Sequence, residues 1–329
     1  MDNMIFNDPI EKETLKQYQS MSLKDKIKLS KEIIIDFYES IDNKNSIYIS
    51  SSFGKDSVVL IDLVRSLYPN IPIGYVDTGV EQPSAVELSK TYDNVITLYP
   101  KKSMKQIVEE YGYPLPIGKE KTNTIELCRK NLYEGKFNTV RVKKMRGDFG
   151  EKSLFNFSKY QWVVFAPFKI SNVCCHFLKH EPFERFDKEY GFKYTFVGTT
   201  AEESRMRKNN LLNHGFITDT QARPIGHWSV QDVLQYILDH NIQIASCYGE
   251  IIWEGNTLKT SRFDRTGCIC CPIGSQYKKI NDFQWLYQTD KKSWDFVINE
   301  LGFRQVLDFF DIPYKDEKRI PTTKQTKLM

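Results

Sequence analysis

The sequence contains no apolar run near the length of about 20 residues that a membrane-spanning helix requires. Its first residues, MDNMIFNDPIEKETLKQ, carry acidic side chains early and contain no apolar core like that of a secretory signal peptide. Internal repeats and low-complexity segments are also lacking. We therefore expect a cytoplasmic protein without a membrane partner, whose 329 residues form one large globular domain or two smaller ones.

The net charge and the cysteine content limit the ligands that the protein is expected to bind. The net charge of +4 is mild, so it permits an anionic substrate without demanding nucleic acid. The chain has seven cysteines. In a cytosolic protein, cysteines more often bind metals or act as reactive thiols than form disulfides.

The first hundred residues alternate between strand and helix patterns. An amphipathic helix at 22–41 is followed by the strand SIYISS (46–51), the loop SFGKDS and the apolar helix VVLIDLVRSLY. Further strands are predicted at 71–79 and 94–100, with a helix between them. This rhythm predicts an α/β fold with a doubly wound, mostly parallel sheet, in which ligands bind beyond the carboxyl ends of the strands.

The rest of the chain departs from this rhythm. Residues 101–160 are polar and basic, and we interpret them as a partly helical insertion. Strands are predicted at 161–167 and 193–200, and a helix at 228–241. We expect three parts: an N-terminal helical segment (1–45), a nucleotide-binding α/β domain with the insertion (46–241), and a loop-rich segment with cysteines and a basic tail (242–329).

The loop SFGKDS has the composition of an anion site. Gly54 permits a tight turn and close approach of a phosphate, Lys55 adds positive charge, and Ser52 and Ser57 offer hydroxyls. The unpaired amides and the positive dipole end of the following helix favour the same ligand. The Walker spacing GxxxxGK[ST] is absent, because Lys55 is followed by Asp56, and this points away from P-loop NTPases. An ordinary capped strand–helix turn is the alternative.

The loop resembles the PP-loop of the N-type ATP pyrophosphatases and adenine nucleotide alpha-hydrolases, which usually reads SGGKDS. Phe53 stands at the first glycine position, a variant of the phosphoadenosine-phosphosulfate (PAPS) reductase branch. In that superfamily the loop cradles the phosphates of ATP or the phosphosulfate of an adenylyl sulfate. The resemblance therefore implies reaction at the α-phosphate.

Three further segments resemble the PAPS reductase family in the same order, over residues 45–275. They are VDTGVEQPSAVEL (76–88), GTTAEESRMR (198–207) and ARPIGHWSVQDVLQYI (222–237), with Thr200 where arginine is usual. Arginines after predicted strand ends suit bidentate binding of phosphate or sulfate. The resemblance implies that Lys55, Asp56, Asp77 and Arg205 are catalytic. The implied nucleotide-binding set is Ser52, Phe53, Gly54, Lys55, Asp56, Ser57, Asp77, Gly198, Glu203, Arg205 and Arg223.

The cysteines form two groups. Cys268 and Cys271 have the CxxC spacing of a metal knuckle, between Gly267 and Pro272, whereas Cys174 and Cys175 are adjacent. Adjacent cysteines joined to a later CxxC resemble the iron–sulfur branch of the adenylyl-sulfate reductases. The resemblance implies a [4Fe–4S] cluster on these four cysteines, with zinc as the alternative. Cys247 and Cys270 could replace a ligand or react, and Cys128 is expected to be buried without a function.

Two reactions fit these features. In the first, an ATP pyrophosphatase with Mg²⁺ activates an acceptor at the α-phosphate, and a sulfur donor such as a cysteine desulfurase completes the transfer. A nucleic-acid acceptor would suit the basic stretch RVKKMR (141–146) and the tail, although solvated charge is the favoured explanation of both.

The second reaction is reduction of PAPS or adenosine phosphosulfate (APS). The chain has no cysteine after Cys271, whereas reductases of this family carry a nucleophilic cysteine on their C-terminal tail. A third interpretation is a non-catalytic nucleotide- or DNA-binding component. In each case we expect an oligomer or a multi-protein complex.

Overall fold

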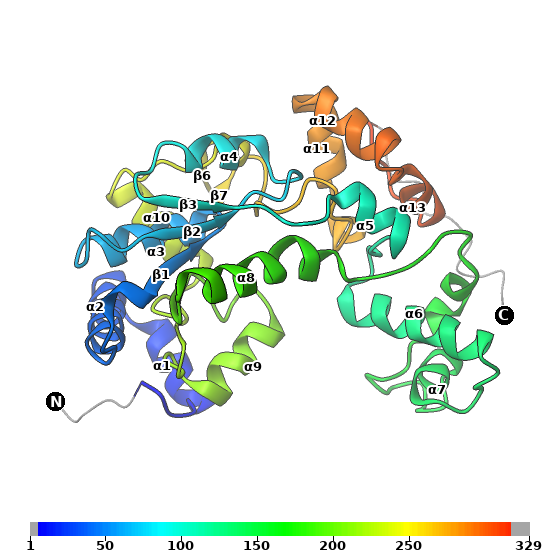
Figure 1. Cartoon of the computed structure of the whole chain (residues 1–329), viewed down its shortest axis with the longest axis horizontal. Helices are drawn as coiled ribbons and strands as arrows, with labels where there is room; N and C mark the ends of the chain where they lie inside the picture. Colours follow the sequence, from blue (N-terminus) through cyan, green and yellow to red (C-terminus); the bar gives the residue numbers. More distant parts are fainter. Residues whose placement is uncertain (1–5, 317–329) are drawn as a thin grey trace. The chain divides into compact units, whose positions relative to one another are not determined.

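The computed structural model describes residues 6–316, and the chain divides into two compact units. Unit 1 comprises residues up to 77, 81–99 and 181–267. Unit 2 comprises 78–80, 100–180 and the residues from 268 onward. Figure 1 shows helices and strands of both units.

Unit 1 contains a five-stranded parallel sheet in the order β3-β2-β1-β4-β5. Its strands are β1 (Ile47–Ser51), β2 (Ile73–Val76), β3 (Val95–Leu98), β4 (Tyr194–Val197) and β5 (Gln221–Ala222). From β1 the chain first adds β2 and β3 on one side, and it later adds β4 and β5 on the other side. The predicted doubly wound α/β fold is confirmed, and its topological switch point lies between β1 and β4.

Helices cover both faces of this sheet. Helix α3 (Lys55–Arg65) contacts β1 and β4, and it also contacts α2 (Leu23–Glu39) and α10 (Val230–Asp239). On the other face, Tyr48 of β1 packs against Phe183 and Phe186 of α8 (Glu181–Tyr190). Both faces of β1 are therefore buried, which explains its nearly continuous apolar sequence.

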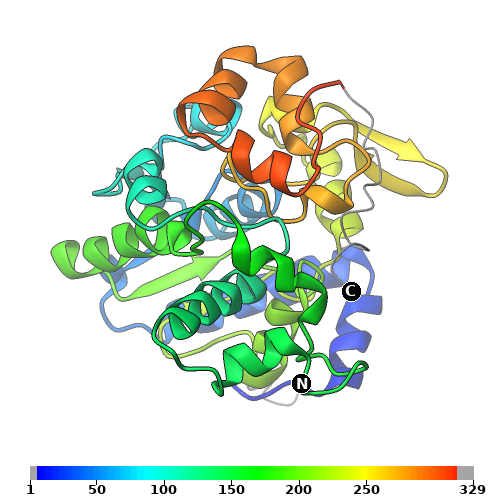
Figure 2. The same ribbon diagram turned by 90° about the vertical axis from the view of Figure 1, so that its right-hand side faces the viewer.

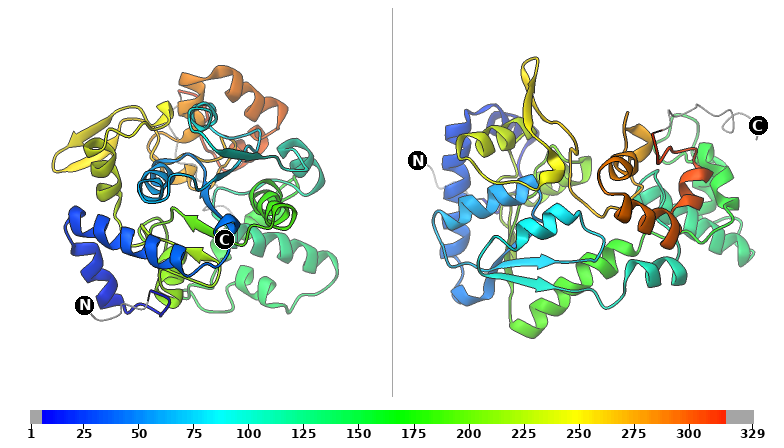
Figure 3. Two further views of the ribbon diagram at one scale, coloured as in Figure 1. Left: turned by 60° about the vertical axis from the view of Figure 1, so that its left-hand side comes forward. Right: turned by 90° about the horizontal axis from the view of Figure 1, so that it is seen from above.

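The remaining elements of unit 1 follow clear local signals. Ser22 caps α2 by accepting a hydrogen bond from the Asp25 amide, and Ser229 and Asp232 form a capping box at α10. The N-terminal helices are dark blue in Figure 3, and the antiparallel hairpin is yellow in Figure 2. The other bounds are α1 (Lys12–Ser20), α4 (Pro83–Ser89), α9 (Arg205–His214), β6 (Ile251–Glu254) and β7 (Thr257–Thr260).

Unit 2 is mainly helical and has its own apolar core, which includes Ile107, Ile125, Val163 and Phe303. The predicted insertion at 101–160 contributes three helices to it. The bounds in this unit are α5 (Met104–Glu110), α6 (Lys119–Tyr133), α7 (Val140–Arg146), α11 (Asp282–Thr289), α12 (Lys291–Asp295) and α13 (Arg304–Phe309).

The strand predicted at 161–167 is wrong. Residues Ser158–Phe165 form a 3₁₀ helix, η2, in which Val163 and Val164 are buried while Phe165 is exposed. A short continuous apolar run has no periodicity that separates a buried strand from a buried helical turn.

The segment after residue 242 combines loops with regular elements, namely the β6–β7 hairpin and α11 to α13. Most of the predicted basic tail lies at 317–329, outside the described residues. Within residues 6–316, no helix combines the length and the apolar character needed to cross a bilayer.

Candidate functional site

The β1–α3 loop adopts an unusual backbone at Phe53. The φ angle of Phe53 is 51°, in the left-handed region that bulky residues rarely occupy. Its ring is fully buried, with ring centroids 5.2 Å from Tyr75 and 5.3 Å from Tyr92. Packing of the ring offsets the backbone strain, so this chain reaches with phenylalanine a conformation for which glycine is the usual choice.

Gly54 is required by close packing. A Cβ atom at this position would lie 2.6 Å from Oγ1 of Thr266 and 3.3 Å from the hydroxyl of Tyr248. Gly54 occupies the N-cap position of α3 and has no side chain to cap the helix. The amino end of α3 therefore lies against the loop that carries Thr266, and its N-cap residue supplies no side-chain hydrogen bond.

Tyr248 holds this loop in place. Its buried hydroxyl accepts hydrogen bonds from the Lys55 amide (3.0 Å) and the Thr266 amide (3.2 Å). It also shares a hydrogen bond with Oγ1 of Thr266 (3.2 Å). Burial raises the pKa of Tyr248 to about 12, so the hydroxyl stays protonated at neutral pH.

Lys55 is a buried cation beside a carboxylate. It is 4% exposed, and its Nζ lies 3.2 Å from Oδ2 of Asp56 and donates to the carbonyl oxygen of Asp264 at 3.2 Å. The predicted pair Lys55 and Asp56 is thus assembled at the first turn of α3. An anionic ligand would compete with Asp56 for this ammonium group.

Two arginines of unit 1 lie close to the same turn. Arg207 forms an ion pair with Glu203, and Arg265 donates to the Glu203 carbonyl oxygen at 2.9 Å. Burial lowers the pKa of Arg207, the nearby positive charge of Arg265 lowers it further, and Asp56 raises it. Arg207, Arg265 and Asp56 therefore influence one another, which makes this a basic cluster facing the loop.

Two polar groups near the ends of β4 and β5 are buried without partners in the described part of the chain. They are Nη1 of Arg223 and Oγ1 of Thr200. Arg223 also donates from Nη2 to Gln221 (3.2 Å), and burial lowers its pKa. Buried donors of this kind normally find a partner, and a bound ligand would supply one for Arg223.

The other predicted residues lie at the same edge of the sheet or at its margin. Gly198 follows β4, and a Cβ there would lie 3.1 Å from Cα of Ser57, so this loop packs directly on α3. Asp77 follows β2, adjacent to β1, and is half-buried. Arg205 is exposed and lines a separate polar hollow with Lys208 and Ser229.

Sequence patterns alone did not reveal Tyr248, Thr266 and Arg265. Arg265 and Thr266 directly precede the Gly267–Cys268 step, so the RTGC stretch carried a signal that was assigned to the cysteines alone. Tyr248 gave no signal, because its role depends on a contact across 193 residues of sequence.

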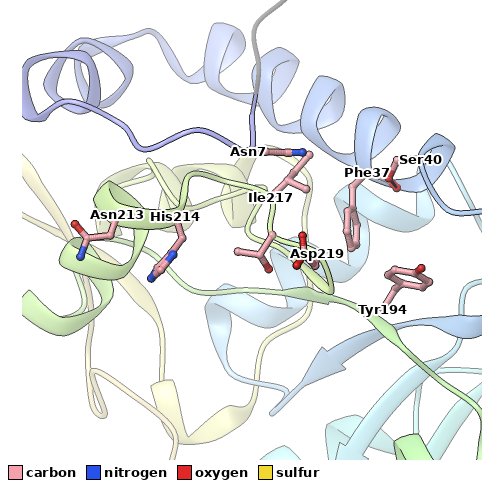
Figure 4. A pocket seen from close by; sticks show the side chains of 9 residues that line it. Asn7, Phe37, Ser40, Tyr194, Asn213, His214, Ile217 and Asp219 are labelled. Carbon is pink, nitrogen blue, oxygen red and sulfur yellow. Dashed lines mark hydrogen bonds between the residues drawn. The ribbon is translucent and has the colours of Figure 1, made fainter.

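A second cavity of unit 1 has a volume of 390 Å³ and a polar lining that includes Asn7, Ser40, His214 and Asp219 (Figure 4). Its wall also includes Tyr194, the first residue of β4. It lies at the amino ends of the strands, opposite the β1–α3 loop, and so is not part of the predicted anion site.

All four predicted cluster cysteines lie in unit 2, and none of the seven cysteines is disulfide-bonded. The Cys271 amide donates to the Cys268 carbonyl oxygen at 3.0 Å, which closes a tight turn. The Cys174 thiol lowers the pKa of Cys175 to about 5 by hydrogen bonding, and Lys119 and Lys179 add to this effect. Burial raises the pKa of Cys271, and the negative charge of Cys175 raises it further.

The donor set matches a cluster site in kind and number. Within residues 6–316, no three histidine, cysteine, aspartate or glutamate side chains converge as metal ligands. The iron–sulfur and magnesium predictions therefore stay predictions. Cys128 is buried, as expected, and burial raises the pKa of its thiol.

The chain is similar to several known proteins. Residues 46–115 and 115–273 match the Phosphoadenosine phosphosulfate reductase domain. An uncharacterized protein of Methanocaldococcus jannaschii is 25% identical over 282 residues, covering 84% of this chain and 53% of that protein. An adenosine 5'-phosphosulfate reductase of Lysinibacillus sphaericus is 24% identical over 200 residues, covering 60% and 66% respectively. The chain thus spans about half to two thirds of these relatives.

Among solved structures, similarity is found to a phosphoadenylyl-sulfate reductase from Candida auris. The identity is 14% and the TM-score 0.39, with 73% of this chain and 92% of that chain covered. Candida glabrata FMN adenylyltransferase in complex with ATP gives 13% identity and a TM-score of 0.40, with 73% and 67% covered. With more than half of its residues matching the family, this chain belongs to the phosphoadenosine phosphosulfate reductase domain family.

Proposed function

We propose that the chain binds an adenine nucleotide at the β1–α3 loop and acts at its α-phosphate in a sulfur-transfer reaction. The observation that carries this proposal is the buried Lys55 at the first turn of α3, close to the arginine pair Arg207 and Arg265. A polyphosphate needs such an arrangement of fixed cations and helix amides.

The chemistry assigned to the loop is adenylation. An acceptor oxygen attacks the α-phosphorus of ATP, the bond between the α-phosphorus and the bridging oxygen breaks, and pyrophosphate leaves with that oxygen and its electron pair. The outer sulfur of a donor persulfide then attacks the acceptor carbon and displaces AMP, and a thiol cleaves the remaining S–S bond so that the donor leaves as a disulfide. Lys55, Arg207 and Arg265 supply positive charge for the departing pyrophosphate.

The carboxylates have a complementary role in this proposal. Asp56 and Asp77 lie at the carboxyl edge of the sheet and are the oxygen donors that would hold Mg²⁺ against the phosphates. Arg223 would direct its unpartnered Nη1 to the nucleotide. Ser52, Ser57 and the loop that contains Gly198 would also contact the nucleotide. Arg205 stays a proposal from the family motif, because it is exposed and lines the hollow beside Lys208.

We further propose a [4Fe–4S] cluster on Cys174, Cys175, Cys268 and Cys271 in unit 2. Support comes from the donor set and from the neighbouring cations Lys119 and Lys179, which favour thiolate over thiol at Cys175. A bound cluster supplies an electron-transfer centre. Anaerobically purified protein should contain iron and absorb broadly in the visible range. Cys268→Ser should remove the colour, whereas Cys128→Ala should keep it; a colourless protein loaded with zinc would refute the cluster.

A second candidate function is reduction of an adenylyl sulfate. It is favoured by the family match and by the relative named adenosine 5'-phosphosulfate reductase. In that reaction a thiolate attacks the sulfur of the sulfonucleotide, the nucleotide phosphate leaves, and a second thiol releases sulfite while a disulfide forms.

One experiment separates the candidates. The anaerobic protein is incubated with labelled ATP or labelled PAPS, with and without a thiol donor. Pyrophosphate and AMP from ATP support the first function, and sulfite from PAPS supports the second. ATP binding without turnover of either substrate would leave a non-catalytic nucleotide-binding component. Lys55→Ala should lower nucleotide affinity at least tenfold, roughly the loss of one charge-assisted contact. Lys12→Ala, at an exposed position on α1, is the control.

A further inference from the structure

The insertion in unit 2 exposes several large apolar side chains close together in sequence. Tyr133 is 94% exposed and Phe155 is 53% exposed. The others in this region are Phe137, Val140, Phe149, Leu154 and Phe165. Single exposed apolar residues are ordinary, but such a concentration, with aromatic rings prevailing, marks an interaction surface.

The same region concentrates the positive charge of the protein. Residues 119–160 contain eleven lysines and arginines against five acidic residues, a net charge of +6. Since the whole chain carries +4, the remaining residues together sum to −2. The insertion is therefore a basic region of a protein that is otherwise slightly acidic.

Rings and charges share one surface. Helices α6 and α7 and the 3₁₀ helix η2 contact one another. Figure 1 shows α6 next to α7. Nζ of Lys144 lies 4.8 Å from the ring centroid of Phe155, and the rings of Phe149 and Phe155 are 6.1 Å apart. Because α7 buries Val142 and Met145, its basic side chains lie on the remaining faces.

We propose that this aromatic–basic surface, formed by α6, α7 and the 147–160 segment, binds single-stranded nucleic acid. Arg141 and Lys143 of α7 and the exposed Lys152 contact the phosphates, whereas Arg146 is held in an ion pair with Asp148, and unpaired bases stack on Phe149 and Phe155. The binding does not depend on the nucleotide chemistry proposed above. That such a strand is the acceptor of the sulfur-transfer reaction does rest on that proposed function.

The exposed rings select the single strand over other anionic partners. In a duplex the base faces are already stacked, so a basic surface contacts phosphates and leaves exposed aromatic rings without a role. An acidic protein segment would use the lysines and arginines but has no flat faces for the rings. Unpaired bases use both features, since every base offers a π-face next to a phosphate.

The test measures fluorescence anisotropy of labelled oligonucleotides of about 20 nucleotides with the full chain, without ATP. Single-stranded DNA, single-stranded RNA and duplex of the same sequence are compared. If three to four side chains neutralise phosphates, the slope of log affinity against log salt is about −2 to −3 for single strands. Affinity then falls roughly 20- to 50-fold between about 50 and 200 mM salt. The DNA and RNA arms identify the preferred sugar.

Two variants separate stacking from charge. Phe155→Ala should weaken single-strand binding about tenfold with an unchanged salt slope, since stacking on one ring is lost. The charge reversals Arg141→Glu and Lys143→Glu should instead reduce the slope. The controls are Trp253→Ala, whose ring is 63% exposed on β6 of unit 1, and Lys28→Glu on α2. If Phe155→Ala loses its thermal transition, Phe149→Ala serves the same purpose.

Three results would overturn the proposal. The first is the absence of salt-dependent binding, and the second is equal affinity for duplex and single strand. The third is an equal loss in the Trp253→Ala control. Because binding is measured without nucleotide, a failed adenylation assay leaves this test unaffected, and a failed binding test leaves the adenylation assay unaffected.

Discussion

Replacing Tyr248 with phenylalanine tests whether its hydroxyl fixes the β1–α3 loop. The hydroxyl is the acceptor for two backbone amides, those of Lys55 and Thr266. The Tyr248→Phe variant leaves the ring in place but removes this acceptor. An unsatisfied buried amide costs about 1–3 kcal/mol. Lys55 is buried whereas Thr266 is partly exposed, so water can satisfy the second amide but not the first.

We therefore expect the free energy of unfolding to fall by about 2–3 kcal/mol, most of it from the Lys55 amide. For a domain of this size the melting temperature should drop by roughly 5–10 °C. Urea and thermal unfolding measure the two quantities. Tyr194→Phe, another tyrosine of unit 1, is the matched control and should change stability by less than about 0.5 kcal/mol.

A double-mutant cycle makes the test specific to the loop contact. Thr266→Val removes the hydroxyl that pairs with Tyr248, and the two changes should couple by about 1 kcal/mol because they share one hydrogen-bond network. Losses that simply add, or a Tyr248→Phe variant as stable as the control, would refute the assigned role of Tyr248.

The remaining predictions concern strain, packing and pH. Phe53→Ala should destabilise more than Phe53→Gly, by about 1 kcal/mol, because glycine accepts the left-handed backbone; equal losses in unfolding experiments would contradict the strain. Gly54→Ala should cost about 1–3 kcal/mol because its Cβ meets Oγ1 of Thr266, and a neutral outcome in thermal unfolding would show that this hydroxyl moves freely. Burial, with a smaller effect of Lys26, lowers the pKa of His227 from 6.5 to about 3. The unfolded chain then binds a proton between these values that the folded protein does not bind, so stability falls as pH decreases. Between about pH 7 and pH 5 the loss should be about 2 kcal/mol in urea unfolding, and His227→Leu should abolish it; an unchanged pH dependence would assign the slope to other groups.

The strand–loop–helix order was predictable because each element carries its own local signal. The β-rich run at 46–51 ends in a glycine- and serine-containing turn, and the apolar run after it suits a helix packed on a sheet. The parallel topology followed, and it placed the ends of β1, β2 and β4 at one edge. The loop pair of the Lys55 cation and the Asp56 carboxylate could therefore be predicted from the sequence.

The remaining parts of the site depend on tertiary contacts. Tyr248 and Arg265 approach the loop from segments about 200 residues further along the chain, and no local pattern encodes such a distance. The exposed position of Arg205 and the inward position of Arg207 follow from the phase of helix α9, which begins at Arg205. Sequence periodicity does not locate the first residue of a helix accurately enough to predict this phase. The misplaced strand at 161–167 has a different origin, because its short apolar run has no periodicity that separates a strand from a helical turn.

The buried ring of Phe53 has a consequence for the thermodynamics of ligand binding. Because the ring is anchored between Tyr75 and Tyr92, the loop is tied to the sheet before any ligand arrives. Ordering a flexible loop would cost about 1–2 kcal/mol per residue, and a preorganised loop avoids this entropic cost. Calorimetry of nucleotide binding should consequently show a smaller unfavourable entropy for the native chain than for Phe53→Gly, even at similar affinity. Phe53 thus strains the backbone of the folded protein but lowers the entropic cost of binding a ligand.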